Sequence, residues 1–170
     1  MPSDTPSESL PDRQAIRDEL ESTRQAYHQL LDSLSDEDWR KKSGNPAWSV
    51  GQLMWHLGRG MEFFTEAVAY CRKGRAPNPP SWLIAPGNVL LTRFGSRGAT
   101  PASAAEKYDR AHKALLACLD SVQEDEWGKG VRIYGADYTI KSTFPEVAVH
   151  YREHELDVLR GLGRQPAGHP

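Results

Sequence analysis

Two histidines stand four residues apart near the C-terminal end of the chain, in the segment HYREH that runs from His150 to His154. In a helix, side chains at positions i and i+4 lie on one face with their Cβ atoms about 5–6 Å apart. Two imidazoles at this spacing can turn toward one ion, with Zn–N distances of about 2.0–2.1 Å. The alternative is a pair of histidines on a solvated flank, because the spacing also arises by chance. A metal site therefore needs a third ligand from another element.

A candidate third ligand is His56, in the segment GQLMWHLGRG. Apolar periodicity predicts a helix here and places His56 at the edge of its inner face, as it does for His150 and His154 on theirs. Gly58 and Gly60 follow, although a glycine in a helix interior costs about 1 kcal/mol relative to alanine. We interpret the two glycines as marking the close approach of another group.

The other histidines and the cysteines are weaker candidates. His112 falls within the apolar stripe of a predicted helix and is interpreted as a hydrogen-bonded histidine of the core or its rim. His28 lies on the polar side of the first predicted helix. Cys71 and Cys118 are interpreted as half-buried apolar side chains, because two isolated cysteines make neither a disulfide framework nor a zinc ribbon.

The composition indicates a water-soluble single domain. The chain has 170 residues, which is enough for one hydrophobic core. Its net charge is −2, from 21 basic and 23 acidic side chains, and no basic run marks a nucleic-acid surface. No apolar run approaches the roughly 18 residues of a membrane helix, and the N-terminal segment lacks the apolar centre of a secretory signal. We expect a cytoplasmic protein with a small-molecule substrate and with neither nucleic acid nor membrane as a partner.

Apolar periodicity predicts four amphipathic helices, which must position the histidines. They are expected at about residues 12–34, 49–72, 100–122 and 142–162. Ser49 and Gln52 have the spacing of a capping box at the start of the second helix. The set predicts an all-α four-helix bundle over residues 12–163, between a disordered N-terminal tail at 1–11 and a C-terminal tail at 164–170.

The connections between these helices differ in character. Residues 34–48 are predicted to be a loop, because Gly, Asn and Pro follow one another there. The Gly- and Pro-rich residues 74–101 form a longer predicted loop, whose apolar stretch from Trp82 to Phe94 is expected to pack on the domain as a lid. Ahead of the last helix, VRIYGADYTI predicts a small β-hairpin that turns at Gly135 to Asp137.

Two of these segments together resemble the DinB-like superfamily of metal-binding four-helix bundles. NPAWSVGQLMWHL places His56 eight residues after Trp48, as at the start of that superfamily's second helix, and HYREH resembles the H-x-x-x-H pair of its last helix. The resemblance covers residues 12–163 and implies helices that run up-down-down-up, with the long loop as crossover. It also implies that His56, His150 and His154 bind a divalent transition metal ion, and that a homodimer is a candidate assembly.

A related branch, the mycothiol-dependent maleylpyruvate isomerases, implies a different third ligand. Its last helix carries Glu-x-x-x-His, and Glu146 with His150 has that spacing. Glu146 is thus the alternative to His154, which we favour because the three-histidine set is complete. Further side chains are candidates for supporting the ligands or shaping a pocket: Trp48, Glu153, Asp157, Tyr134, Tyr138 and Arg132.

Three neutral imidazoles would leave a divalent ion with an open position, which is the pattern of catalytic zinc sites. The open position can hold a water or a thiolate. Imidazole suits several ions, so Zn, Ni, Fe and Mn all stay candidates. The resemblance implies an enzyme that activates a low-molecular-weight thiol, in the manner of an S-transferase, with water as the alternative nucleophile. Two other readings stay open: a non-catalytic metal-binding or stress-response bundle, and a helical interaction module without metal.

Overall fold

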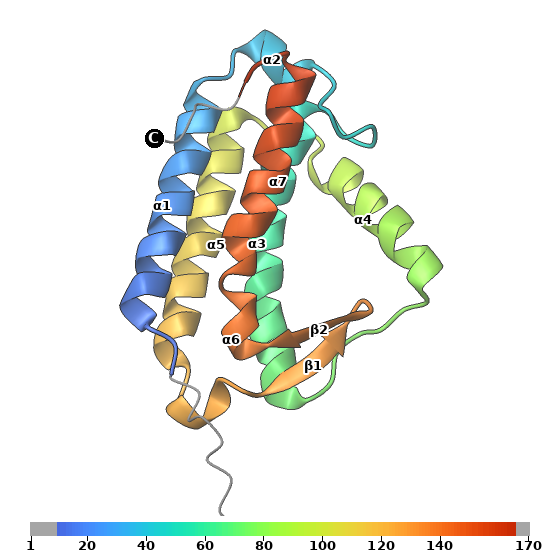
Figure 1. The fold of residues 1–170 in the computed structure, drawn as a ribbon. Coiled ribbons are helices and arrows are strands. Elements are labelled where there is room, and N and C mark those ends of the chain that lie inside the picture. Colours follow the sequence, from blue (N-terminus) through green and yellow to red (C-terminus); the bar gives the residue numbers. More distant parts are fainter. Residues whose placement is uncertain (1–9, 166–170) are drawn as a thin grey trace, which may run out of the picture.

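The computed structural model describes residues 10–165, so most of both predicted tails, residues 1–9 and 166–170, lies outside the described residues. Helices dominate the described part of the chain and confirm the all-α class (Figure 1). The elements are α1 (Arg13–Asp32), α2 (Asp36–Arg40), α3 (Val50–Lys73), α4 (Ser81–Gly95), α5 (Pro101–Ser121), a 3-10 turn (Glu124–Glu126), β1 (Gly130–Ile133), β2 (Ala136–Thr139), α6 (Ile140–Thr143) and α7 (Glu146–Gly161). None of these helices is both long and apolar enough to cross a membrane.

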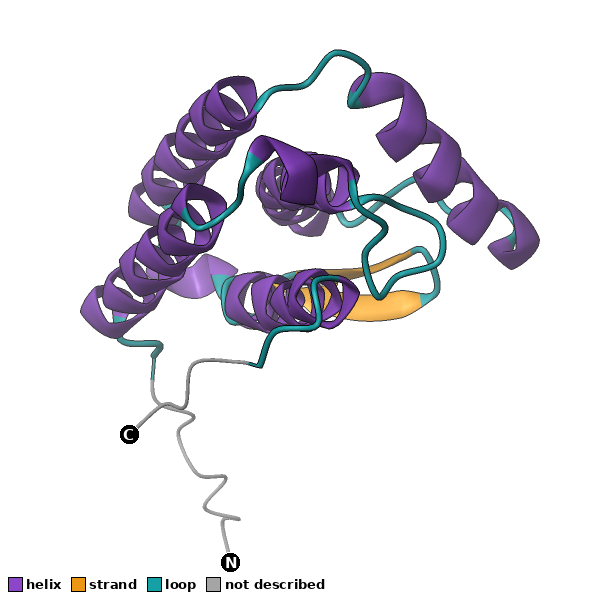
Figure 2. Ribbon diagram, turned by 90° about the horizontal axis from the view of Figure 1, so that it is seen from above, coloured by secondary structure: helices purple, strands orange, loops and turns teal. Residues whose placement is uncertain are grey.

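The four long helices α1, α3, α5 and α7 pack side by side, and hydrogen bonds between their ends fix their directions (Figures 1 and 2). Arg13, at the start of α1, donates to a carbonyl in the last turn of α5. Arg72, near the end of α3, donates to the Ser121 carbonyl at the end of α5. The N–H of Gly44, just before α3, donates to the Asp157 carbonyl near the end of α7. Helices α3 and α5 are therefore parallel, and α1 and α7 run in the opposite direction.

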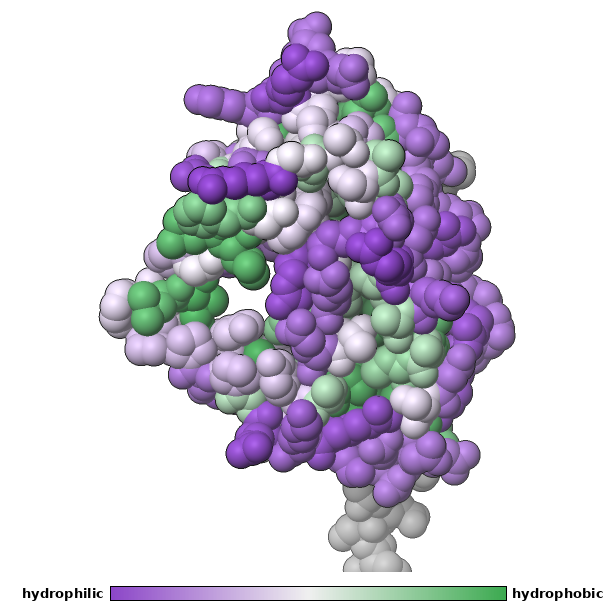
Figure 3. Space-filling view, turned by 180° about the vertical axis from the view of Figure 1, so that it is seen from behind, coloured by the Kyte–Doolittle hydropathy of each residue, from purple (hydrophilic) through white to green (hydrophobic). Residues whose placement is uncertain are grey.

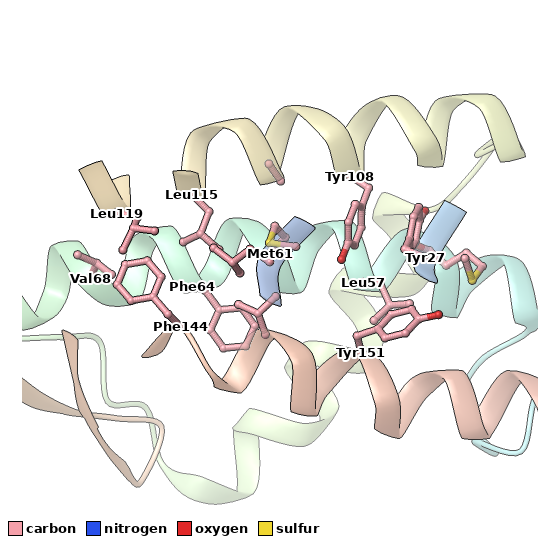
Figure 4. Close-up of a cluster of buried hydrophobic side chains, with 14 of the residues drawn as sticks. Tyr27, Leu57, Met61, Phe64, Val68, Tyr108, Leu115, Leu119, Phe144 and Tyr151 are labelled. Carbon is pink, nitrogen blue, oxygen red and sulfur yellow. The ribbon is translucent and has the colours of Figure 1, made fainter. Parts of the chain in front are cut away.

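The core lies between these four helices (Figure 4). The rings of Tyr27 from α1 and Tyr108 from α5 stack at 3.8 Å between centroids. Full burial of a large apolar side chain contributes about 1.5–3 kcal/mol, so a core of this size orients all four helices. Its other members include Leu57, Met61, Phe64, Val68, Leu115, Leu119, Phe144 and Tyr151.

The start of α3 is fixed by the predicted capping box. Ser49 Oγ accepts from the Gln52 N–H at 3.3 Å, and Gln52 Oε1 accepts from the Ser49 N–H at 3.0 Å. These bonds satisfy two backbone donors that a helix start leaves open. They also set the helical phase of His56, seven residues after the cap, which brings its side chain to the face toward α7.

The prediction of a continuous loop between α3 and α5 is wrong, because residues 81–95 form α4. Proline residues at 79 and 80 precede it, and Pro86 lies inside it, where it removes one backbone N–H. The helix is held by contacts with α3 at its C-terminal half, where Thr92 is fully buried and Val89 is partly buried. Its N-terminal half stands away from the bundle (Figures 1 and 2).

Two further predictions are corrected locally. The loop predicted at 34–48 contains α2, which begins with a capping box between Ser35 and Asp38. The last helix is not continuous, because α6 ends at Thr143 and α7 begins after Pro145, whose ring and missing N–H interrupt the backbone hydrogen bonds.

The predicted hairpin is confirmed, with β1 and β2 paired antiparallel so that Ile133 lies opposite Ala136. Its turn is at Tyr134 and Gly135, one residue earlier than predicted. Both residues have positive φ, 50° and 87°, as a two-residue turn with the twist of a hairpin requires. The hairpin lies across the end of the bundle where α3 and α5 finish (Figure 1).

Candidate metal centre

The three histidines predicted to share an ion lie together. One ligand atom from each of His56, His150 and His154 can be chosen so that all three lie within 4.8 Å of one another. The Nε2 atoms of His56 and His150 are 3.3 Å apart. Two nitrogens at about 2.0–2.1 Å from one tetrahedral ion are about 3.4 Å apart, so this pair already has a suitable separation. The residues therefore fit a metal ion, supplied by α3 on one side and α7 on the other.

The close approach of α7 to α3 depends on Gly60. A Cβ atom at Gly60 would lie 2.4 Å from Cε1 and 2.9 Å from Nδ1 of His150. The glycine therefore leaves the space that the His150 ring occupies, as the sequence predicted for a group approaching this helix. Gly58 has another role, because its missing Cβ faces the side chain of Lys107 on α5.

The ring nitrogens away from the cluster are held by two polar side chains. His154 Nδ1 lies 3.3 Å from Asp157 Oδ2, and since a carboxylate accepts, His154 donates. His56 Nδ1 lies 3.1 Å from Oγ1 of Thr92. Ligand histidines in metal sites are commonly held in this way, which fixes the tautomer and leaves the other nitrogen for the metal. Asp157 was predicted from its position, whereas Thr92 was missed, although it is the one hydroxyl residue in the apolar stretch 82–94.

Trp48 forms the wall behind the cluster. Its ring stacks on His56 at 4.5 Å between centroids and meets His154 edge-on at 6.0 Å. Trp48 is buried, and its Nε1 has no hydrogen-bond partner among residues 10–165. Phe64 meets His150 edge-on at 5.9 Å. Both aromatic rings restrict the imidazoles, and the buried Trp48 keeps water from its side of the cluster.

Burial sets the protonation state of two of the histidines. Desolvation lowers the pKa of His150 to about 3, and the neighbouring His154 adds to this effect. Desolvation likewise lowers the pKa of His56 to about 3, with His150 and His154 as further causes. Both rings are therefore neutral near pH 7, which is the form that binds metal.

A cavity of 560 Å³ adjoins the histidines. His56 and His150 line it, together with residues of α4, the hairpin and α7, whereas His154 does not. Viewed from behind, an opening separates the apolar surface around α4 from the bundle (Figure 3). Cavities of about 300–1,000 Å³ are typical of small-molecule sites. The cluster thus has one side closed by aromatic rings and another open to a small molecule.

The remaining predicted pocket residues divide into two groups. Tyr134 and Tyr138 of the hairpin line the cavity, as do Glu146 and Glu153 of α7. Glu146 is not part of the set of ligand atoms within 4.8 Å found among residues 10–165. Arg132 does not line the cavity and pairs with Asp137 at 3.4 Å on the hairpin.

Two other histidines lie apart from the cluster, between α1 and α5. His112 is buried, and its Nε2 is 3.8 Å from Oε2 of Glu21. His28 Nε2 is 2.8 Å from Oδ1 of Asp109. Neither shares a ligand set with a third donor among residues 10–165, so the cluster between α3 and α7 is the candidate metal centre.

The order of elements and the histidine cluster can be compared with known families. The family model described as the DinB superfamily matches residues 19–157, which is most of the chain. The chain belongs to the DinB superfamily. No curated protein matches it by sequence.

Two solved structures share the fold of this DinB-superfamily chain. One is a mycothiol-dependent maleylpyruvate isomerase, with a TM-score of 0.70 and 12% identity over 87% of this chain and 61% of that one. The other is a protein from Streptococcus pneumoniae, with a TM-score of 0.61 and 14% identity over 90% and 91% of the two chains. At these identities the likeness shows the fold alone. The chain spans about three fifths of the isomerase's length.

Proposed function

We propose that this DinB-superfamily protein is a metal-dependent enzyme in which His56, His150 and His154 bind a divalent transition metal ion. In this proposal, a low-molecular-weight thiol, or a water, is activated at the site for attack on a small electrophile. The observation that carries it is the convergence of three histidine ligand atoms at the wall of an open cavity.

The arrangement supports a catalytic rather than a structural ion. Structural zinc sites are usually closed by four protein ligands, whereas only three donors meet here among residues 10–165. A divalent ion bound in this way would supply a Lewis acid that lowers the pKa of a thiol or water at its open position. The choice among Zn, Ni, Fe and Mn does not follow from three imidazoles.

The chain's own residues would orient and shield the reactants. Thr92 and Asp157 hold the rings of His56 and His154 from behind. Trp48 excludes water on the closed side. Because His56 and His150 line the cavity, a substrate placed there meets the two ligands whose Nε2 atoms face each other.

A thiol is favoured over water as the nucleophile because one solved structure with this fold is a mycothiol-dependent isomerase. Transfer to an aryl halide is a simple test reaction. The sulfur–carbon bond forms as the carbon–halogen bond breaks, halide leaves with the bonding pair, and the thiol proton passes to the buffer. No residue of the chain is needed as a redox partner.

The test is a thiol-transfer assay on the purified protein loaded with each candidate metal. Mycothiol and a panel of simple thiols would be offered with 1-chloro-2,4-dinitrobenzene, and the thioether followed by absorbance. We expect thioether formation above the rate of metal-free protein, and its loss in His56→Ala. Metal binding without turnover for any thiol, or for ester substrates that test water, would favour the non-catalytic metal-binding or stress-response alternative. Failure to bind metal would leave a helical interaction module.

A further inference from the structure

Among residues 10–165, Arg59 is the one arginine or lysine that lines the cavity, and it forms an ion pair with Glu66. Arg59 Nη2 donates to Oε2 of Glu66 at 3.2 Å, and Nη1 lies 3.1 Å from Oε1 without the alignment of a hydrogen bond. Glu62 lies at 4.0 Å from the same guanidinium. Nη1 is buried and has no hydrogen-bond partner among residues 10–165. The charge of this guanidinium is nevertheless offset by the two neighbouring carboxylates, Glu66 and Glu62.

Two acidic side chains that line the cavity are free. Glu146 and Glu153 are both exposed, and neither makes a hydrogen bond or ion pair with another of residues 10–165. They are seven residues apart on α7, which corresponds to about two turns and about 10 Å along the axis. Residues at positions i, i+4 and i+7 share one helix face, so the two carboxylates flank His150. This wall of the cavity carries two unpaired negative charges.

Aromatic rings of α3 and the hairpin line the same cavity as these carboxylates. Phe63 and Tyr134 are stacked at 5.9 Å between centroids, and Tyr138 meets Phe63 edge-on at 6.0 Å. The faces of such rings attract cations. Burial raises the pKa of the Tyr138 phenol, and the charge of Glu146 raises it further. The negative field of Glu146 thus reaches the aromatic side of the cavity, where it disfavours an anion and favours a cation.

We propose that this cavity selects a small molecule with an apolar or aromatic body and a primary ammonium group, held by Glu146 and Glu153 above the aromatic rings. The inference rests on the proposed function in one respect, because the apolar body of the same molecule would carry the electrophilic group on which the site acts. The apolar body is accommodated by α4, whose Leu83, Ile84 and Leu91 line the cavity. An anionic molecule of equal size meets two unpaired carboxylates there and a guanidinium whose charge Glu66 offsets.

The test is a binding titration with two probes of nearly equal size, phenethylamine and 3-phenylpropionate, on metal-free protein. We expect the amine to bind about tenfold more tightly, because the two carboxylates attract its ammonium group and repel the carboxylate of 3-phenylpropionate. The double variant Glu146→Gln/Glu153→Gln should bind the amine about tenfold more weakly than wild type does. Glu19→Gln makes the same charge change at an exposed site on α1 and should leave both affinities unchanged.

A reciprocal variant tests the role assigned to Arg59. Glu66→Gln removes the carboxylate that pairs with this guanidinium. We expect it to raise the affinity for 3-phenylpropionate several-fold and to lower the preference for the amine. If the preference for the amine is unchanged in this variant, pairing with Glu66 is not what keeps Arg59 from binding an anion. That result would count against the proposal.

The preference for the amine can be tested independently of metal binding and catalysis. The same titrations on His56→Ala remove a metal ligand and leave both carboxylates in place. An amine preference in His56→Ala and in metal-free protein would uphold the inference even if no metal ever binds. The inference would be overturned if the two probes bind equally well, if the anion binds more tightly, or if neither binds. It would also be overturned if the double variant leaves the affinity for the amine unchanged. These outcomes count whatever the metal content.

Discussion

The ring of His150 occupies the space beside the Cα atom of Gly60 that a side chain would need. A Cβ atom built on Gly60 would lie 2.4 Å from Cε1 of the imidazole, well inside van der Waals contact. This contact brings α7 close enough to α3 for the Nε2 atoms of His150 and His56 to lie 3.3 Å apart. The absence of one side chain on α3 therefore sets the geometry of two candidate ligands.

Replacing Gly60 by alanine tests this relationship. We expect Gly60→Ala to displace the His150 ring and to weaken metal binding roughly tenfold or more, the size of effect that misplacing a ligand through its supporting contacts produces. Gly58→Ala is the matched control, because its Cβ would meet Lys107 Cγ at 3.2 Å, and this flexible side chain can move. Chelator competition would measure both affinities. Equal affinities for the two variants would contradict the assigned role of Gly60.

Thr92 is expected to support the centre through His56. Thr92→Val keeps the shape of a fully buried side chain but removes the hydroxyl that lies 3.1 Å from His56 Nδ1. We expect about tenfold to hundredfold weaker metal binding, because outer partners of ligand histidines contribute by that factor. Thr92→Ser restores the hydroxyl and should recover most of the affinity. If the serine and valine variants bind metal equally, the hydroxyl is not the feature that matters.

The acid stability of the fold should depend on Asp38. The hydrogen bond from Lys41 and that from the Ser35 N–H lower the pKa of Asp38 to about 2. A carboxyl whose pKa is lower in the folded state than its unfolded value of about 3.9 stabilises the fold fully above that value, and this contribution is lost as the pH falls through the folded pKa. Asp38→Asn should therefore unfold more easily than wild type at pH 7.

The difference in the free energy of unfolding between Asp38→Asn and wild type should shrink as the pH falls from about 4 to 2. Urea unfolding at several pH values measures it. Asp36→Asn removes one negative charge at an exposed site of the same helix and is the charge-matched control. A difference that stays constant across this range would mean that Asp38 does not stabilise the fold through its charge.

The histidine cluster could be predicted from the sequence because the signals were local. The spacing of His150 and His154 gives one helix face, and Ser49 with Gln52 fixes the start and phase of α3. Gly60 stands out because a glycine in a helix interior destabilises the helix relative to alanine, which indicates that another group packs closely there. The pairing of α3 with α7 came from a family resemblance, since no local pattern specifies which helices meet.

What the sequence did not reveal depends on tertiary contacts. Proline and glycine around Pro86 indicated a loop, yet contacts near Thr92 hold this segment as α4. The role of Thr92 could not be predicted while the segment was treated as a loop, because its helical phase was unknown. Val149 of α7 lines the cavity, and Leu156 of the same helix is exposed. The homodimer stays a prediction.

The most direct test of the central claim is the metal content of the untagged protein by elemental analysis, for wild type, His56→Ala, His154→Ala and Glu146→Gln. We expect about one equivalent of a transition metal in wild type and in Glu146→Gln, and its loss in both histidine variants. Metal kept in His154→Ala but lost in Glu146→Gln would make Glu146 the third ligand. Absence of metal from wild type after reconstitution with each candidate ion would show that the three histidines do not form a metal centre.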